Sequence, residues 1–174
     1  MKVFVLSTGY LETDAAGIVA GESGPIRLPV LCFLLQTPEH NLLFDTGCHP
    51  DAFTHGGYCK ADLDLAQNDY TLLDADTELF PGVEVVQLPG HTPGLMGLVV
   101  HLAGGVVLLP QDCVYTAANY GPPVRRTGSA ANWEDYHASI EKLRALQERY
   151  NAKIVFAHDW AQAQTLQYAP DFYA

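Results

Sequence analysis

The chain has few basic residues, no closely spaced cysteine pair and no long apolar run. Only 9 of its 174 residues are lysine or arginine, against 20 aspartates and glutamates, so the formal net charge is -11 at pH 7. A surface of that sign repels phosphate backbones and anionic lipids. No apolar stretch reaches the roughly 20 residues that a membrane-spanning helix needs. We therefore expect neither a nucleic acid nor a membrane as a partner.

Two features of the sequence indicate the cellular compartment: the spacing of the four cysteines and the first residues of the chain. Cys32, Cys48, Cys59 and Cys113 are scattered without a CxxC pair, which argues against both a zinc ribbon and a disulfide framework. The opening sequence MKVFVLSTGYLETD lacks a long apolar core followed by a cleavage site. We expect reduced thiols and a cytoplasmic protein.

The composition that remains is that of one folded domain covering residues 1–174. Hydrophobic residues make up 48% of the chain and charged residues 17%, as in ordinary globular proteins. Apolar runs bounded by turn residues predict strands, and these are Lys2–Ser7, Pro29–Thr37, Asn41–Asp45, Val83–Leu88, Leu95–Leu102, Gly105–Pro110 and Lys153–Ala157.

One helix is predicted near the C-terminal end of the chain, in the sequence NWEDYHASIEKLRALQERY. Asn132 is suited to cap its N-terminus, and Glu134 and Asp135 are favourable in its first turn. Apolar side chains recur at helical spacing along it: Tyr136, Ile140, Leu143, Leu146 and Tyr150. Strands before and after this helix predict an α/β or α+β sheet protein.

The stretch from Cys48 to Val83 has little periodicity and many acidic residues. We expect it to be a long loop, which is unusual within a compact domain. Just before it, Gly47 permits a sharp turn that would present Asp45 at the end of its strand.

Three predicted strands are each followed by a potential metal ligand: His91 within LPGHTPG, Asp112 after GVVLLPQ, and His158 after KIVFA. Rigid strands can fix ligands while loops shape a pocket. Two imidazoles and a carboxylate suffice for one divalent ion with positions open for water, whose pKa a bound zinc lowers to about 7. For each residue the alternative is a structural role: a hydrogen-bonding histidine, or a turn acid for Asp112.

The remaining histidines are weaker candidates. His137 is expected to be solvated on the helix, and His101 and His40 are expected to be structural, in a strand and a turn. His49 and His55 flank the acidic stretch and could reach the same strand ends, so their roles stay open.

The segments LLFDTGCHPDA, VEVVQLPGHTPG, VVLLPQDCVYTAANY and IVFAHD, in this order, resemble the metallo-β-lactamase superfamily and, within it, the N-acyl-homoserine lactonase-like branch. The resemblance implies an αββα sandwich with two metal ions, usually zinc. It implies that His91, Asp112 and His158 are metal ligands and that Asp112 bridges the ions. Tyr115 matches a tyrosine that lies near the substrate carbonyl in the lactonase branch.

The sequence departs from the family in one respect. The family's HxHxDH ligand cluster is absent, and the stretch between Asp45 and His91 is too short for the strand and helix that carry it. Four of the seven usual ligands have no counterpart. The sequence leaves open whether an internal segment has been lost near residues 55–60. Such a loss predicts a reduced sandwich with one sheet face partly uncovered, and from this we expect a homodimer.

These observations lead to three hypotheses for the function. The first is a metal-dependent hydrolase that opens a lactone or ester of a small molecule, with zinc, or manganese, iron or cobalt, held by His91, Asp112 and His158. Asp112 and Tyr115 would be the catalytic residues. The second is an inactive binding module of the same fold. The third is a subunit that completes its site from a second chain.

Overall fold

The computed structural model describes residues 1–45 and 71–174, whose strands form two sheets. The first sheet is antiparallel with the order β1-β2-β3, made of β1 (Lys2–Asp14), β2 (Pro25–Gln36) and β3 (Asn41–Phe44). The second has the order β4-β5-β6-β7-β8. Its strands are β4 (Thr77–Phe80), β5 (Val83–Gln87), β6 (Met96–Leu102), β7 (Gly105–Leu109) and β8 (Lys153–Ile154). Only the β7–β8 pair is parallel among these strands.

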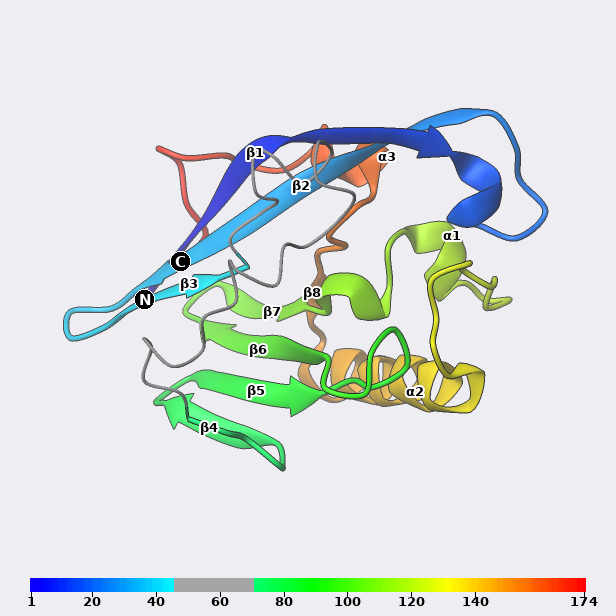
Figure 1. Ribbon diagram of the computed structural model, residues 1–174. Coiled ribbons are helices and arrows are strands. Elements are labelled where there is room, and N and C mark those ends of the chain that lie inside the picture. Colours follow the sequence, from blue (N-terminus) through cyan, green and yellow to red (C-terminus); the bar gives the residue numbers. More distant parts are fainter. Residues whose placement is uncertain (46–70) are drawn as a thin grey trace.

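The core between the two sheets follows from alternating side chains on each strand. In the first sheet Val3 lies opposite Leu35 and Val5 lies opposite Phe33, and all four side chains are buried. They share one cluster with the inward-facing residues of the second sheet: Val83, Val85, Leu98, Val100, Val107 and Leu109. The two sheets therefore pack face to face (Figure 1).

The other face of the second sheet is covered by α2 (Trp133–Tyr150). Buried Val86, Leu88, Val99 and Leu108 of the sheet region pack with the apolar face of this helix, which carries Tyr136, Ile140 and Leu143 as predicted. Asn132 caps the helix by accepting hydrogen bonds from the backbone N–H groups of residues 134 and 135. The layers are thus sheet, sheet and helix.

The outer face of the first sheet has a much thinner cover in the described part of the chain. The short helix α3 (Trp160–Ala163) lies beside β2, and Phe172 packs on Phe4. Leu43 of β3 remains 51% exposed. The described residues thus form the predicted α+β sandwich of two sheets, with this outer helical layer the smaller of the two.

The predicted strands lie where expected, with differences at their ends. β1 continues to Asp14 and β2 begins at Pro25, because the two form a long hairpin with a register shift between Ser7 and Gly9. The stretch predicted as one long loop contains β4, which pairs with β5. Its four residues are too short to show periodicity. Residues 46–70, with His49, His55, Cys48, Cys59 and the region of residues 55–60, lie outside the described residues.

The last predicted strand, Lys153–Ala157, pairs over two residues only. The side chain of Gln162 in α3 donates to the carbonyl of Ile154 at 2.9 Å and accepts from the N–H of Phe156 at 2.8 Å. These bonds take the place of strand pairing. Four short elements of the described chain were not predicted: η1 (Ala15–Gly17), η4 (Gln111–Cys113), α1 (Ala117–Tyr120) and α3 (Trp160–Ala163).

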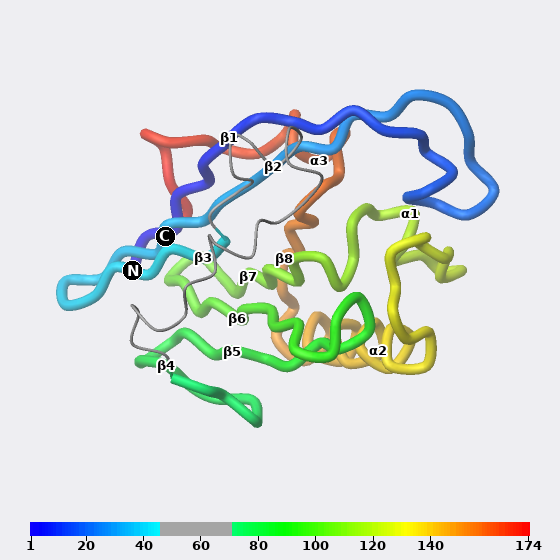
Figure 2. Tube along the Cα trace, in the orientation of Figure 1, coloured from blue at the N-terminus to red at the C-terminus, as the bar shows by residue number. Residues whose placement is uncertain are grey.

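The two ends of the described chain meet on the first sheet (Figure 2). Val3 and Tyr173 exchange backbone hydrogen bonds of 2.8 and 2.9 Å. The thiols of Cys32 and Cys113 are buried, and burial raises the pKa of Cys113 to about 12. Among the described helices, none has the length and apolar character required to cross a bilayer.

Replacing Asn132 with alanine tests the capping of α2. The substitution removes the side-chain acceptor for two backbone N–H groups, and we expect it to lower the free energy of unfolding by about 1 kcal/mol in urea denaturation. Glu148→Ala, at an exposed position of the same helix, is the control and should change stability by less than about 0.5 kcal/mol. Equal effects of both substitutions would contradict the assigned cap.

Candidate metal and catalytic site

The loop LPGHTPG connects β5 to β6 and lies against the start of α2. The carbonyl of Gly90 accepts from the N–H of Asn132 at 3.0 Å, and the hydroxyl of Ser139 donates to the carbonyl of Pro89 at 2.6 Å. Both bonds join the loop to the helix or its cap. The backbone that carries His91 is therefore held by the helix as well as by its own prolines.

Gly90 is the residue that permits this close approach. Its φ is +138°, which side-chain-bearing residues rarely adopt, and a Cβ there would lie 2.5 Å from the Cα of Tyr136. A second glycine of the loop, Gly94, has open space around it. Close packing on α2 thus depends on Gly90, and the orientation of His91 follows from that packing.

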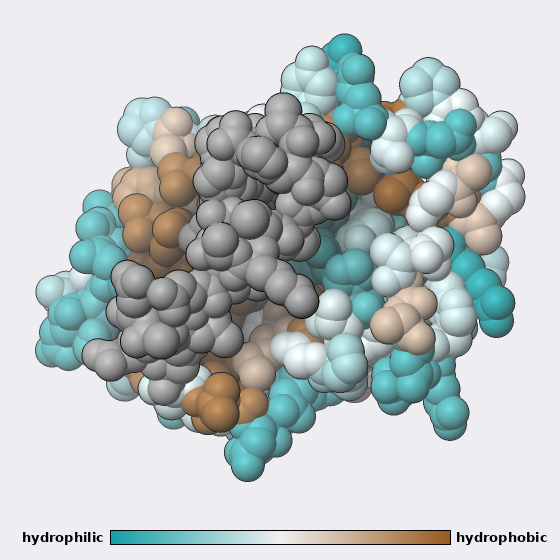
Figure 3. All heavy atoms as spheres, viewed as in Figure 1, coloured by the Kyte–Doolittle hydropathy of each residue, from teal (hydrophilic) through white to brown (hydrophobic). Residues whose placement is uncertain are grey.

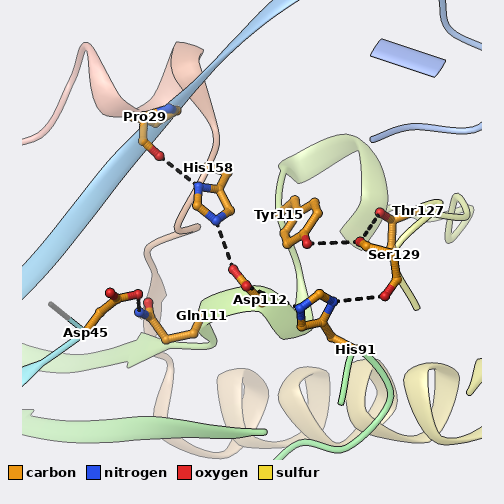
Figure 4. A network of polar contacts seen from close by, with 9 residues as sticks. All are labelled: Pro29, Asp45, His91, Gln111, Asp112, Tyr115, Thr127, Ser129 and His158. Carbon is orange, nitrogen blue, oxygen red and sulfur yellow. Dashed lines mark hydrogen bonds and ion pairs between the residues drawn. The ribbon is translucent and has the colours of Figure 1, made fainter. Parts of the chain in front are cut away.

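Asp112 and His158 come from two other elements and meet His91 at one point. Asp112 lies in η4, directly after β7, and His158 follows the segment after β8. The Nε2 atom of His158 is 2.9 Å from Oδ1 of Asp112, and the Nε2 atom of His91 is 3.4 Å from Oδ2. Each imidazole thus faces a different oxygen of one carboxylate (Figure 4).

The second ring nitrogen of each histidine is held by a backbone carbonyl. Nδ1 of His91 is 3.0 Å from the carbonyl oxygen of Ser129, and Nδ1 of His158 is 2.8 Å from that of Pro29. Since a carbonyl only accepts, each Nδ1 carries the hydrogen. In each neutral imidazole, the Nε2 atom then carries a lone pair that points at an oxygen of the Asp112 carboxylate. Two hydrogen-bond acceptors that face each other are favourable only with a proton or a cation between them. Histidines that bind metals are held in the same way, with the other ring nitrogen donating to a carbonyl or carboxylate.

The distances suit a metal ligand set. Two ligands of one tetrahedral zinc, each about 2.1 Å from the ion, are about 3.4 Å apart, which matches the 3.4 Å between His91 Nε2 and Asp112 Oδ2. Among residues 1–45 and 71–174, however, no group of three or more histidine, cysteine or acidic side chains converges on one point as a metal site. The described residues instead place Asp112 between two histidines, one on each side.

The surroundings of His158 favour its protonated form. Burial lowers the pKa of this histidine, but the hydrogen bond and the charge of Asp112 outweigh burial, and the net pKa is raised above 6.5. The bond to the Pro29 carbonyl and the charge of Asp45 act in the same direction. The site therefore favours a positive charge next to Asp112.

Tyr115 lies beside both histidines. Its ring makes edge contacts with His91 at 5.8 Å and with His158 at 5.0 Å between centroids, and 8% of the residue is exposed. Its hydroxyl accepts from the hydroxyl of Ser129 at 2.9 Å. All four predicted site residues, His91, Asp112, Tyr115 and His158, are brought together by the fold.

Asp159 connects the segments that carry Tyr115 and His158. Its carboxylate accepts from the N–H of Gln162, capping α3, and from the N–H of Ala117 at the start of α1, at 2.8 and 2.9 Å. The N–H of His158 donates to the carbonyl of Tyr115 at 3.1 Å. These bonds set the spacing between the tyrosine and the histidine.

Asp45 and Gln111 lie next to the site at the ends of β3 and β7. Both have positive φ, and Gln111 Nε2 donates to Oδ2 of Asp45 at 2.6 Å. The sequence predicted that Asp45 would stand at the end of its strand, which the structure shows. It did not point to Gln111, Thr127 or Ser129, since no residue pattern marks a contact made across distant loops.

The remaining described histidines lie away from this point. His101 pairs with Glu84 at 2.9 Å and packs on Tyr150, His40 stacks on Phe80, and His137 is exposed on α2. In Figure 3, brown hydrophobic spheres and teal hydrophilic spheres lie next to one another in the upper right part of the face shown.

Comparisons with solved structures define the class of the fold. A variant of the AiiA lactonase of Bacillus thuringiensis, with N-decanoyl-L-homoserine at its active site, superposes with a TM-score of 0.83 at 20% identity, covering 99% of this chain and 98% of that chain. AidC, a dizinc quorum-quenching lactonase, gives 0.69 at 12% identity, covering 91% and 87%. The hydrolase AbOPH, of the beta lactamase superfamily, gives 0.62 at 13% identity, covering 90% and 86%. The chain has the metallo-β-lactamase fold.

Sequence comparison identifies the family, although no family model matches the chain. The chain is 36% identical to the N-acyl homoserine lactonase AiiB of Agrobacterium fabrum, over 95% of this chain and 96% of that relative. It is 30% identical to the lactonase AttM of Azorhizobium caulinodans, over 94% of this chain and 61% of that relative. The chain belongs to the N-acyl homoserine lactonase family of hydrolases.

The alignment with AiiB also bears on the length of the chain. It extends over 264 positions, more than the 174 residues of this chain. The relative therefore has residues within the aligned span that are absent here. The AttM match, likewise, spans less than two thirds of that relative.

Gly90→Ala tests how His91 is held. The new Cβ would meet the backbone of α2 and the positive φ would be strained, so we expect the free energy of unfolding to fall by about 3 kcal/mol or more. Gly94→Ala, in the same loop with open space around it, is the matched control. Urea denaturation of both variants measures the difference, and an unchanged Gly90→Ala protein would show that the loop does not depend on this packing.

Proposed function

We propose that this protein is a metal-dependent hydrolase that opens the lactone ring of an acylated small molecule, as the names of its relatives state for them. The observation that carries the proposal is the placement of Asp112 between two imidazoles whose Nε2 atoms face it. Tyr115 lies against both of these rings. Membership of the lactonase family supports the same reaction.

His91, Asp112 and His158 would serve as ligands of one or two divalent cations. A bound divalent ion would polarise the substrate carbonyl and lower the pKa of a water. Zinc suits a set of two imidazoles and a carboxylate, and manganese, iron and cobalt are alternatives. The Nδ1 bonds to the carbonyls of Ser129 and Pro29 keep both Nε2 atoms directed at Asp112.

The two catalytic roles fall to Asp112 and Tyr115. Water adds to the carbonyl carbon of the lactone, Asp112 accepts a proton from that water, and the phenol of Tyr115 donates a hydrogen bond to the oxygen that gains negative charge. The ring C–O bond then breaks, and the released alkoxide takes up the proton that Asp112 had accepted, which gives the hydroxy acid and restores the carboxylate.

The ring of Tyr115 packs into an apolar environment beside the proposed site. Tyr115 belongs to a small apolar cluster with Ile18, Val19 and Leu28, against which Leu11 and Ile26 pack. These residues come from the β1–β2 hairpin and the turn at its tip. Because Ile18, Val19 and Leu28 are buried against Tyr115, they hold its ring in place beside the two histidines.

Lactone hydrolysis by the purified protein, measured with its metal content, tests the proposal. We expect wild type with added zinc or manganese to hydrolyse N-acyl homoserine lactones or aryl esters. Asp112→Asn should lower kcat/KM by about 100-fold or more, and His158→Ala should lower both bound metal and activity. His137→Ala, at an exposed histidine, is the control.

Elemental analysis decides between this function and its alternatives. Two metals, or one metal, per active chain would agree with the proposal. No bound metal, no activity and a melting temperature unaffected by zinc or chelator would overturn it in favour of a binding module. Activity that rises steeply with protein concentration would indicate a site completed by a second chain.

A homodimer is the second part of the proposal. Leu43 and Leu34 lie opposite one another on the outer face of the first sheet, where Leu43 is 51% exposed. Light scattering should give twice the 19.0 kDa chain mass. Leu43→Lys should shift the protein to monomer, whereas Leu72→Lys, at a residue that is 92% exposed, should not. A monomeric wild type would exclude the dimer.

A further inference from the structure

Ser129 contacts two proposed functional residues with different parts of its own structure. Its backbone carbonyl accepts from Nδ1 of His91 at 3.0 Å, and its hydroxyl donates to the hydroxyl of Tyr115 at 2.9 Å. Figure 4 shows this residue beside both side chains, on the loop that follows α1. A ligand of the proposed metal and the proposed oxyanion donor are therefore joined through one residue.

A second hydroxyl continues the chain of hydrogen bonds into the protein. The hydroxyl of Thr127 is 3.0 Å from that of Ser129, and Thr127 is 4% exposed. With Ser129 donating to Tyr115, Thr127 is the donor to Ser129, and the phenolic hydrogen is directed to a different acceptor. Successive hydroxyls that donate in one direction polarise one another, which strengthens the last donor in the row.

The loop that carries both hydroxyls is fixed on the tip of the β1–β2 hairpin. The N–H of Gly128 donates to the carbonyl of Gly17 at 2.9 Å, and the N–H of Ala20 donates to the carbonyl of Arg126 at 2.8 Å. A Cβ on Gly128 would lie 2.9 Å from that same oxygen of Gly17. The position of Ser129 is thus set by backbone contacts on either side of it.

We propose that Ser129 is a positioning residue for the hydrolysis: its hydroxyl orients the phenol of Tyr115 toward the substrate oxygen while its carbonyl orients His91. The inference rests on the proposed function, since it concerns the donor for that reaction. The two contacts can be separated experimentally, because a side-chain substitution removes the hydroxyl and leaves the carbonyl that holds His91.

A double-mutant cycle with Tyr115 tests the role of the hydroxyl. Ser129→Ala should lower kcat roughly 10-fold with bound metal and KM little changed, and Ser129→Thr, which retains a hydroxyl, should restore most of the rate. In a Tyr115→Phe background, Ser129→Ala should cause no further loss, since the residue acts through the phenol. Ser23→Ala, at an exposed serine, is the matched control.

A spectroscopic measurement tests the contact independently of activity. In protein labelled with ¹³C at the tyrosine Cζ position, the resonance that Tyr115→Phe removes should shift in Ser129→Ala and stay in place in Ser23→Ala. The proposal is overturned if Ser129→Ala leaves both kcat and this resonance unchanged, or if it lowers kcat equally in the Tyr115→Phe background. A wild-type protein without hydrolytic activity would overturn the proposed function, while the resonance would still report whether Ser129 orients the phenol.

Discussion

The arrangement on which the site depends is one carboxylate between two imidazoles that cannot turn away from it. Each ring is fixed through Nδ1 to a backbone carbonyl, so both Nε2 atoms are directed at Asp112. Two neutral rings and a carboxylate in this geometry place acceptors against acceptors. The protein must hold a proton or a cation there, and the raised pKa of His158 is the consequence when only a proton is present.

This arrangement requires all layers of the fold. His158 is held by the carbonyl of Pro29 in the first sheet, Asp112 follows a strand of the second, and His91 lies on a loop packed against α2. The reduced outer layer beside the first sheet does not disturb these contacts, because they lie at the ends of the strands. The chain can therefore be much shorter than its AiiB relative and still bring these three residues together.

Much of this could be predicted from local sequence. The strands, the helix with its Asn132 cap and the rigidity of LPGHTPG follow from residues that are neighbours in the chain. β4 could not be predicted, because its four residues show no periodicity. The strand at Lys153 was predicted, but its early end at Ile154 was not, because the side chain of Gln162 replaces strand pairing there. Ser129 was missed for a similar reason: a serine in a polar loop looks like any other turn residue.

The sequence by itself determined which chemical groups lie at the strand ends. It also places Gly90 in the loop that carries His91, where the positive φ is one that few residues other than glycine adopt. Only the tertiary structure decided which oxygen of Asp112 each imidazole faces, which ring nitrogen carries the hydrogen, and that Ser129 joins His91 to Tyr115. The physical reason is separation along the chain: the partners of His91 and His158 are 38 and 129 residues away. Contacts over such distances exist only once the sheets and α2 have packed.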